Sequence, residues 1–169
     1  KQPITLVGNA HIDPVWLWKR CEGLSEVKST FRSALDRMRE FPDYIFTCAC
    51  ASYYRWIEAV DPGMFDEIRG RVAEGRWSVA GGMWVQPDCN LPSGEAFARH
   101  FLYSQRYFTE KFGAAATVGY NVDSFGHNGM LPQLLRQAGL DSYVFTRPGA
   151  GEEPGLPPLF LWESPGGSR

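Results

Sequence analysis

Two short stretches of the sequence carry residue types that could do chemistry. In the first, His11 and Asp13 form a His-x-Asp pair shortly after residues 4–7, an apolar run of strand-forming residues. Residues two apart on an extended chain project to the same side, so an imidazole and a carboxylate would leave the strand end together. This pair suits a divalent metal such as zinc, although a His-x-Asp pair alone is a weak signal that structural roles could also explain.

The second stretch, at residues 121–127, reads Asn-Val-Asp-Ser-Phe-Gly-His and continues from a run of strand formers at 117–122. Asp123 would therefore lie at the end of a later strand and could supply a third ligand to the same ion. Three protein ligands of mixed nitrogen and oxygen type leave room for a substrate at the metal. A role in a turn alone would not explain the combination of Asp123 with the distant His11 and Asp13.

Aromatic and basic side chains beside these stretches are candidates for the walls of the site. Trp16 follows the first stretch, Phe125 lies in the second, and Arg147 follows a later predicted strand. Core packing could also explain the two aromatic residues, and a surface ion pair could explain Arg147. For His127 we favour support of the site over direct ligation of the metal. Asp88 either faces the same cleft or solvates its own loop.

The elements that would position these residues alternate between strands and helices. Strands are predicted at residues 4–7, 44–48, 77–80, 117–122, 142–146 and 159–163. Helices are predicted at residues 23–40, 53–60, 62–74, 94–112 and 129–138. This α/β series predicts parallel strands with covering helices, and its functional residues are expected at the carboxyl ends of the strands. Five to six strands are too few to close the usual barrel, so we expect a partial parallel β/α barrel from a larger catalytic domain.

The composition excludes some classes of partner. The net charge of −2 indicates neither a nucleic-acid surface nor a membrane surface, and no apolar run approaches the roughly 20 residues of a membrane span. The chain shows no signal-peptide pattern, so we expect a cytoplasmic protein, although the sequence starts at Lys1 rather than Met. A homo-oligomer, if formed, would use regions outside these residues. Cys48, Cys50 and Cys89 could form a structural zinc site, but buried free thiols are the favoured interpretation.

The two stretches also carry a family resemblance. The sequence from Ala10 to Trp16 and the sequence from Asn121 to His127 resemble the N-terminal catalytic domain of the glycoside hydrolase family 38 α-mannosidases. The resemblance covers residues 4–148, and two such blocks in the right order are highly specific. It implies a seven-stranded parallel β/α barrel in the full-length protein, of which residues 1–169 would be the N-terminal portion.

The resemblance also implies a role for each candidate residue. His11 and Asp13 match zinc ligands, and Asp123 matches a carboxylate that both binds the zinc and attacks the anomeric carbon. Trp16 and Phe125 match aromatic positions that line the sugar pocket, and Arg147 matches an arginine close to that carboxylate. A further histidine ligand and an acid/base aspartate are expected beyond Arg169, so this chain alone should bind zinc incompletely and should not turn over substrate.

Three functions remain open from the sequence. The resemblance favours a zinc-dependent retaining α-mannosidase that hydrolyses terminal α-mannosyl linkages in mannose-containing oligosaccharides or glycans. A metal-dependent carbohydrate deacetylase also uses Asp and His at strand ends, but its attacking group is water rather than an enzyme carboxylate. The third alternative is a non-catalytic β/α domain that binds sugars.

Overall fold

A computed structural model describes residues 4–149 and 151–169, which form two compact units. The first unit comprises residues 4–48 and 52–79, and the second comprises 49–51, 80–149 and 151–169. The elements of the first unit are β1 (Gly8–Asn9), α1 (Arg20–Glu40), β2 (Phe46–Cys48), most of α2 (Ala51–Val60), α3 (Pro62–Ala73) and β3 (Trp77–Val79). Those of the second unit are α4 (Gly94–Phe112), β4 (Val118–Tyr120), α5 (Leu131–Gln137) and β5 (Ser142–Val144).

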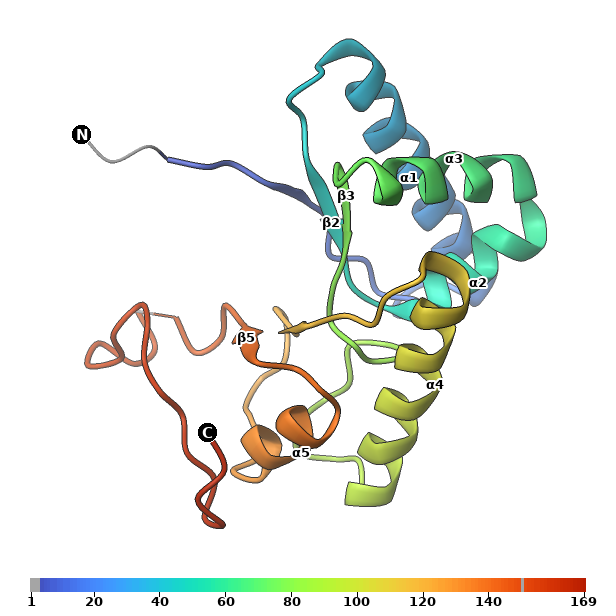
Figure 1. Cartoon of the computed structure of the whole chain (residues 1–169). Helices are drawn as coiled ribbons and strands as arrows, with labels where there is room; N and C mark the ends of the chain where they lie inside the picture. Colours follow the sequence, from blue (N-terminus) through green and yellow to red (C-terminus); the bar gives the residue numbers. More distant parts are fainter. Residues whose placement is uncertain (1–3, 150) are drawn as a thin grey trace. The chain divides into compact units, whose positions relative to one another are not determined.

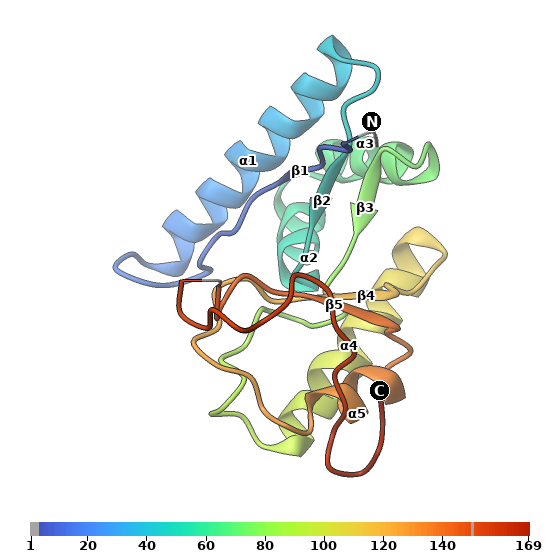
Figure 2. The same cartoon turned by 90° about the vertical axis from the view of Figure 1, so that its left-hand side faces the viewer.

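A three-stranded parallel sheet in the order β1-β2-β3 organises the first unit. Its register pairs Gly8 with Phe46 and Phe46 with Trp77. The helices of this unit lie on one face of the sheet (Figures 1 and 2). Helix α1 turns an apolar stripe inward, because its buried residues recur at three- and four-residue spacing: Gly23, Val27, Phe31, Ala34, Leu35 and Met38.

The core of the first unit is built around Trp77. The centroids of the Phe31 and Phe46 rings lie 5.0 and 4.7 Å from that of its ring, both in edge-on geometry. The indole N–H donates to the Tyr54 hydroxyl at 2.9 Å, and this hydroxyl donates to the Cys48 carbonyl at 2.9 Å. The polar ends of both buried rings are therefore satisfied, which removes the cost of burying an unpaired donor.

The second unit contains the parallel pair β4-β5, with Gly119 in register with Tyr143. The segment that follows β3 joins this pair, because the Gly81 N–H donates to the Val118 carbonyl at 2.8 Å. Helix α4 begins and ends as its sequence predicts. The Ser93 hydroxyl accepts a hydrogen bond from the third helical N–H at 3.2 Å, and Gly113 ends the helix in the left-handed conformation, with φ of 81°.

The strand predicted at residues 4–7 is wrong. These four residues are exposed, and the ladder begins only at Gly8, directly after them. A strand needs a neighbour along its whole length, and β2 begins only at Phe46. The chain before β2 turns instead, with the Tyr44 N–H bonded to the Phe41 carbonyl at 3.1 Å. Apolar composition therefore identified a strand-forming segment but misplaced its paired residues.

The strand predicted at residues 159–163 is also wrong, since this segment has no ladder partner. Pro157 and Pro158 immediately before it have no N–H to donate. Phe160 nevertheless packs on Phe145, with ring centroids 6.0 Å apart. The described residues thus form five strands in two small parallel sheets, which do not by themselves make the predicted barrel. Among these residues, no helix combines the length and apolar character that a membrane span requires.

Candidate active site

His11 and Asp13 lie just past the end of β1 in the first unit. Their side chains approach each other, with His11 Nε2 and Asp13 Oδ1 3.4 Å apart. Both remain accessible, since 29% of the His11 side chain and 39% of the Asp13 side chain are exposed. The pair therefore offers one nitrogen and one oxygen donor at the carboxyl end of a parallel strand, where functional sites of α/β folds occur.

The donor spacing is compatible with zinc. Two ligands at the usual Zn–N and Zn–O bond lengths and a tetrahedral angle lie roughly 3.3–3.5 Å apart. The observed separation of 3.4 Å falls in this range. A simple ion pair would have a similar separation, so the spacing fits a metal without requiring one.

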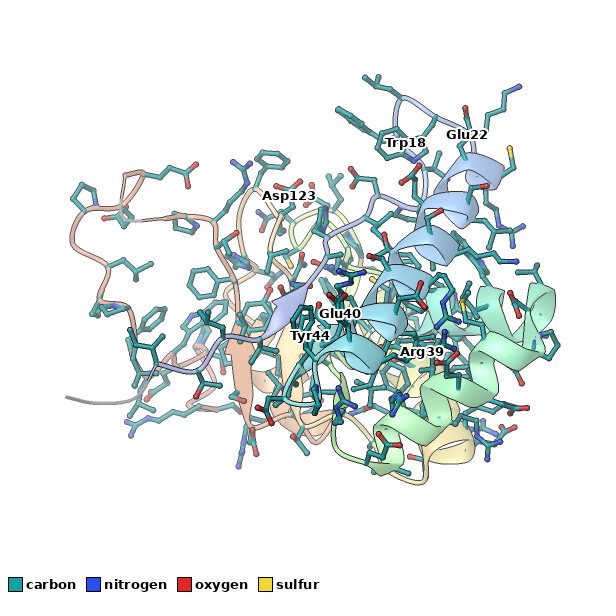
Figure 3. All side chains as sticks on the ribbon, turned by 90° about the horizontal axis from the view of Figure 1, so that it is seen from above. Trp18, Glu22, Arg39, Glu40, Tyr44 and Asp123 are labelled. Carbon is teal, nitrogen blue, oxygen red and sulfur yellow. The ribbon has the colours of Figure 1, made fainter. Side chains whose placement is uncertain are left out.

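The backbone of this loop is held by residues that the sequence reasoning did not identify. The indole N–H of Trp18 donates to the Asp13 carbonyl at 3.1 Å, and the Tyr53 hydroxyl donates to the Ile12 carbonyl. Trp18 lies just before the first turn of α1, where Figure 3 also labels Glu22. The Glu22 carboxylate accepts the N–H of Lys19 at 2.7 Å, which starts α1 three residues before the predicted position.

Gly23 in α1 lets the loop pass close to the helix. A Cβ atom at this position would collide with the carbonyl oxygen of Pro14 and would lie 3.0 Å from its carbonyl carbon. Both are backbone atoms, so they cannot rotate away as the end of a side chain can. Gly23 therefore fixes how the residues directly after Asp13 pass over the helix.

We expect Gly23→Ala to destabilise the protein and to impair the site, although alanine is the better helix former. Moving the Pro14 backbone should cost on the order of 1–3 kcal/mol, more than the roughly 1 kcal/mol gained in helix propensity. Gly70→Ala in α3 is the matched control, because nothing lies within 4 Å of a Cβ there. Thermal unfolding of the full-length protein should show a lower Tm for Gly23→Ala and an unchanged or higher Tm for Gly70→Ala. Equal Tm values for the two variants would contradict this role of Gly23.

Trp16 lies on the surface of the loop rather than in a core. This residue is 64% exposed, and its ring meets that of Trp18 edge-on, with ring centroids 5.2 Å apart. An exposed indole braced by a second indole can offer a flat apolar surface to a ligand. Within the first unit, Trp16 is therefore not a core residue.

The second unit brings together three of the candidate residues. Asp123 lies on the loop after β4 (Figure 3), and its Oδ1 accepts a hydrogen bond from Arg147 Nε at 2.8 Å. The Arg147 guanidinium also lies over the Phe125 ring, 4.8 Å from its centroid, and Phe125 is 78% exposed. The arrangement fixes an arginine between a carboxylate and an aromatic face.

His127 supports the same loop through both ring nitrogens. Its Nε2 lies 2.6 Å from the Arg147 carbonyl oxygen, and its Nδ1 lies 3.2 Å from the Tyr143 hydroxyl. Sequence reasoning selected His127 but not Tyr143, whose position within β5 gave no chemical signal. The hydrogen bonds of His127 are thus made with protein groups around Arg147.

A third loop of the second unit, at residues 86–90, is bound to the loop after β4. The Asn121 side-chain amide donates to the Pro87 carbonyl at 2.8 Å and to Cys89 Sγ at 3.1 Å. The Cys89 N–H donates to the Ser124 hydroxyl at 3.2 Å. Asn121 and Ser124, which flank Asp123 in the second stretch, therefore hold the loop that presents this carboxylate.

The remaining candidates have local explanations. Asp88 is exposed, and its carboxylate accepts the N–H of Asn90 at 2.9 Å, as in an Asx turn. His100 lies within α4, where burial lowers the pKa of its side chain. The four cysteines are free thiols: Cys48, Cys50 and Cys89 are buried, and Cys21 is exposed.

Comparison with known proteins identifies the family. The family model described as "Glycosyl hydrolases family 38 N-terminal domain" matches residues 1–169. The chain belongs to glycosyl hydrolase family 38. Alpha-mannosidase G of Dictyostelium discoideum is 34% identical over 163 residues, a match that covers 96% of this chain and 15% of that protein. Alpha-mannosidase 2C1 of Homo sapiens is 33% identical over 167 residues, covering 98% of this chain and 16% of that protein.

Solved structures support the family 38 fold. The crystal structure of an alpha-mannosidase from Enterococcus faecalis V583 matches 82% of this chain and 16% of its own, with a TM-score of 0.75 and 24% identity. A 4-alpha-glucanotransferase from Thermococcus litoralis matches 82% of this chain and 21% of its own, with a TM-score of 0.65 and 18% identity. These likenesses concern the fold, and the second shows that the fold alone does not select a reaction.

The family 38 chain thus carries its candidate residues in two sets. His11, Asp13 and Trp16 belong to the first unit, and the second unit holds Asp123, Phe125, His127 and Arg147. The structure shows the contacts within each set. A shared metal site of His11, Asp13 and Asp123 stays a prediction, as do the individual roles of the residues.

Proposed function

We propose that the protein to which this chain belongs is a zinc-dependent retaining α-mannosidase that removes terminal α-mannosyl units from glycans. Membership of family 38 and the names of the relatives support the activity. The chain spans 15–16% of the length of the two relatives described above, so the activity is proposed for the whole protein. The observation that carries the chemistry is the contact between Asp123 and Arg147, 2.8 Å long, beside the exposed face of Phe125.

In this proposal Asp123 is the nucleophile. One of its carboxylate oxygens forms a bond to the anomeric carbon, while the bond from that carbon to the glycosidic oxygen breaks. The leaving oxygen takes a proton from a second carboxyl group, about 5 Å away, as retaining glycosidases require. Water then attacks the same carbon, returns its proton to the second carboxyl group and releases Asp123. We propose that the second carboxyl group comes from a part of the protein beyond Arg169.

Arg147 and Phe125 prepare the nucleophile. The guanidinium holds one oxygen of Asp123 through its Nε and keeps the carboxylate in a fixed orientation. The contact of Arg147 with the Phe125 ring limits the freedom of the long arginine side chain. Positioning of this kind lowers the barrier because the reacting groups need little reorganisation.

We propose that His11, Asp13 and Asp123 hold the zinc, with a further histidine from later in the protein. When bound, the ion would supply Lewis-acid binding of two neighbouring sugar hydroxyls. The 2-OH and 3-OH groups of a manno-configured sugar are a natural pair for this purpose, so His11 and Asp13 would contribute to substrate selection. Trp16 would provide an apolar wall for the sugar ring. In the full-length protein these loops would meet at the mouth of a seven-stranded parallel β/α barrel.

The test uses the full-length protein with a chromogenic α-mannoside. We expect hydrolysis with release of the α-anomer of mannose, visible by NMR in the first minutes of the reaction. Activity should be lost after dialysis against a chelator and should return with zinc. Release of acetate from an acetylated sugar would instead support the deacetylase alternative, and binding of mannosides without turnover would support a non-catalytic domain. Release of the β-anomer would contradict the retaining mechanism.

A further inference from the structure

A continuous series of hydrogen bonds leads from the β5 strand to Asp123. The Tyr143 hydroxyl lies 3.2 Å from His127 Nδ1, and His127 Nε2 lies 2.6 Å from the Arg147 carbonyl oxygen. Arg147 Nε in turn donates to Asp123 Oδ1 at 2.8 Å. All four residues belong to the second unit. The series links Tyr143 to Asp123 through His127 and Arg147 rather than directly.

The chemistry of the partners assigns the protons. A carbonyl oxygen only accepts, so His127 Nε2 must carry a hydrogen and donate it to Arg147. The tautomer with its hydrogen on Nε2 leaves Nδ1 as an acceptor for the Tyr143 hydroxyl. Burial raises the pKa of Tyr143, so the phenol keeps the proton that it needs as a donor. Tyr143 thereby selects the histidine tautomer that binds the main chain at Arg147.

Aromatic neighbours hold the His127 ring in this orientation. Its centroid lies 5.5 Å from that of Tyr143, 4.8 Å from that of Phe145 and 6.1 Å from that of Trp162. Tyr143 is itself part of a paired strand, since it lies in register with Gly119 of β4. The series therefore begins on a paired strand and reaches Asp123 through the side chain of Arg147, so that a regular element of the fold supports the reactive group.

We propose that Tyr143 is a positioning residue of the active site: through His127 it fixes the main chain at Arg147 and so directs the guanidinium onto Asp123. The inference rests on the proposed function, because that function gives Asp123 its role as nucleophile. Loss of the hydroxyl should leave substrate binding intact and should slow the step in which Asp123 attacks. Its effect should therefore fall on kcat rather than on KM.

The decisive variant is Tyr143→Phe in the full-length protein, which removes the hydroxyl and keeps the aromatic ring. We expect kcat for a chromogenic α-mannoside to fall roughly 10-fold, with KM within about twofold. A loss of this size is typical when a hydrogen-bond partner that orients an active-site residue is removed. Tyr103→Phe is the matched control, because Tyr103 is an exposed tyrosine on α4 and should leave both constants unchanged.

A double-mutant cycle tests whether Tyr143 acts through His127. His127→Gln can still place an amide N–H towards the Arg147 carbonyl but has no ring Nδ1 to accept from the tyrosine. In that background Tyr143→Phe should have little further effect on kcat, because the ring nitrogen that links the hydroxyl to Arg147 is already gone. Independent, multiplicative effects of the two substitutions would overturn the proposed series.

A crystal structure of the Tyr143→Phe protein provides a readout that does not depend on activity. We expect the separation of Arg147 Nε and Asp123 Oδ1 to increase beyond hydrogen-bond distance, about 3.5 Å. An unchanged contact together with an unchanged kcat would refute the inference. A wild-type protein that hydrolyses no α-mannoside would refute the proposed function, and the geometry in the variant would still decide whether Tyr143 positions Arg147.

Discussion

Replacing Asp123 with asparagine in the full-length protein is expected to lower kcat for α-mannoside hydrolysis roughly 10⁴-fold, as loss of an essential member of a nucleophilic site does. Asparagine keeps the shape of aspartate and can still accept a hydrogen bond from Arg147 through its amide oxygen. It lacks the negative charge that attacks the anomeric carbon and neutralises the positive charge developing there. Thermal unfolding should therefore change little, which separates a chemical defect from a folding defect.

The control for this substitution is Asp88→Asn. Asp88 is an exposed carboxylate whose only assigned duty is to accept the Asn90 N–H in a turn, and asparagine performs the same duty. The change of charge is identical, so kcat should stay within about twofold of the wild-type value. A comparable loss of activity in both variants would mean that the charge of the region matters rather than the nucleophile.

Covalent trapping gives the most direct view of Asp123. A fluorinated mannosyl reagent slows hydrolysis of the glycosyl-enzyme, so the intermediate should accumulate and be detected by mass spectrometry of peptides. The label should be on the peptide that contains Asp123 and should be absent from the Asp123→Asn protein. Label on a different carboxylate, or none in an active enzyme, would exclude Asp123 as the nucleophile.

Local chemistry made parts of the fold predictable from the sequence. The start of α3 follows from Asp61 and Pro62, since the aspartate accepts the Met64 N–H at 3.1 Å and the proline occupies the first helical position. Ser93 and Gly113 predict the ends of α4 in the same way. Each signal involves residues within one turn of each other, so no knowledge of the rest of the chain is needed.

Features that depend on distant partners were not predictable to the same degree. The run at residues 4–7 has the composition of a strand, but the length of β2 decides which residues pair. The strand predicted at residues 159–163 did not form, because this segment has no ladder partner. Composition therefore indicates segments that could form strands, whereas a neighbouring strand, which composition does not reveal, decides which residues pair.

The candidate site shows the same division. Asp123 and Arg147 are visible in the sequence because a carboxylate and an arginine after predicted strands suggest chemistry, and the structure places them 2.8 Å apart. Gly23 and Tyr143 are not visible, because their importance depends on what a distant loop or side chain places against them. Residues that react can thus be suggested by type and spacing, while residues that position them require the fold.

Replacing His11 with alanine is the second substitution expected to have a large effect, because it removes the only nitrogen ligand that we assign within this chain. Asp13 would keep its carboxylate, which lies 3.4 Å from His11 Nε2 in the unaltered protein, but the three proposed ligands within this chain would be reduced to two. Loss of a residue that only hydrogen-bonds to a metal ligand lowers metal affinity roughly 10- to 100-fold. We expect the loss of zinc affinity in His11→Ala to be larger, because the ligand itself is removed. Hydrolytic activity should fall with the metal content.

The measurement combines metal analysis with activity across a zinc titration of the full-length His11→Ala protein. His100→Gln is the matched control, since His100 lies within α4 and is not assigned to the site, so its metal content should equal that of the wild type. If His11 is a ligand, high concentrations of zinc should restore part of the activity of His11→Ala, because weakened binding is overcome by mass action. Full zinc content with a low kcat would show instead that His11 acts on the substrate directly, and full activity would remove His11 from the site.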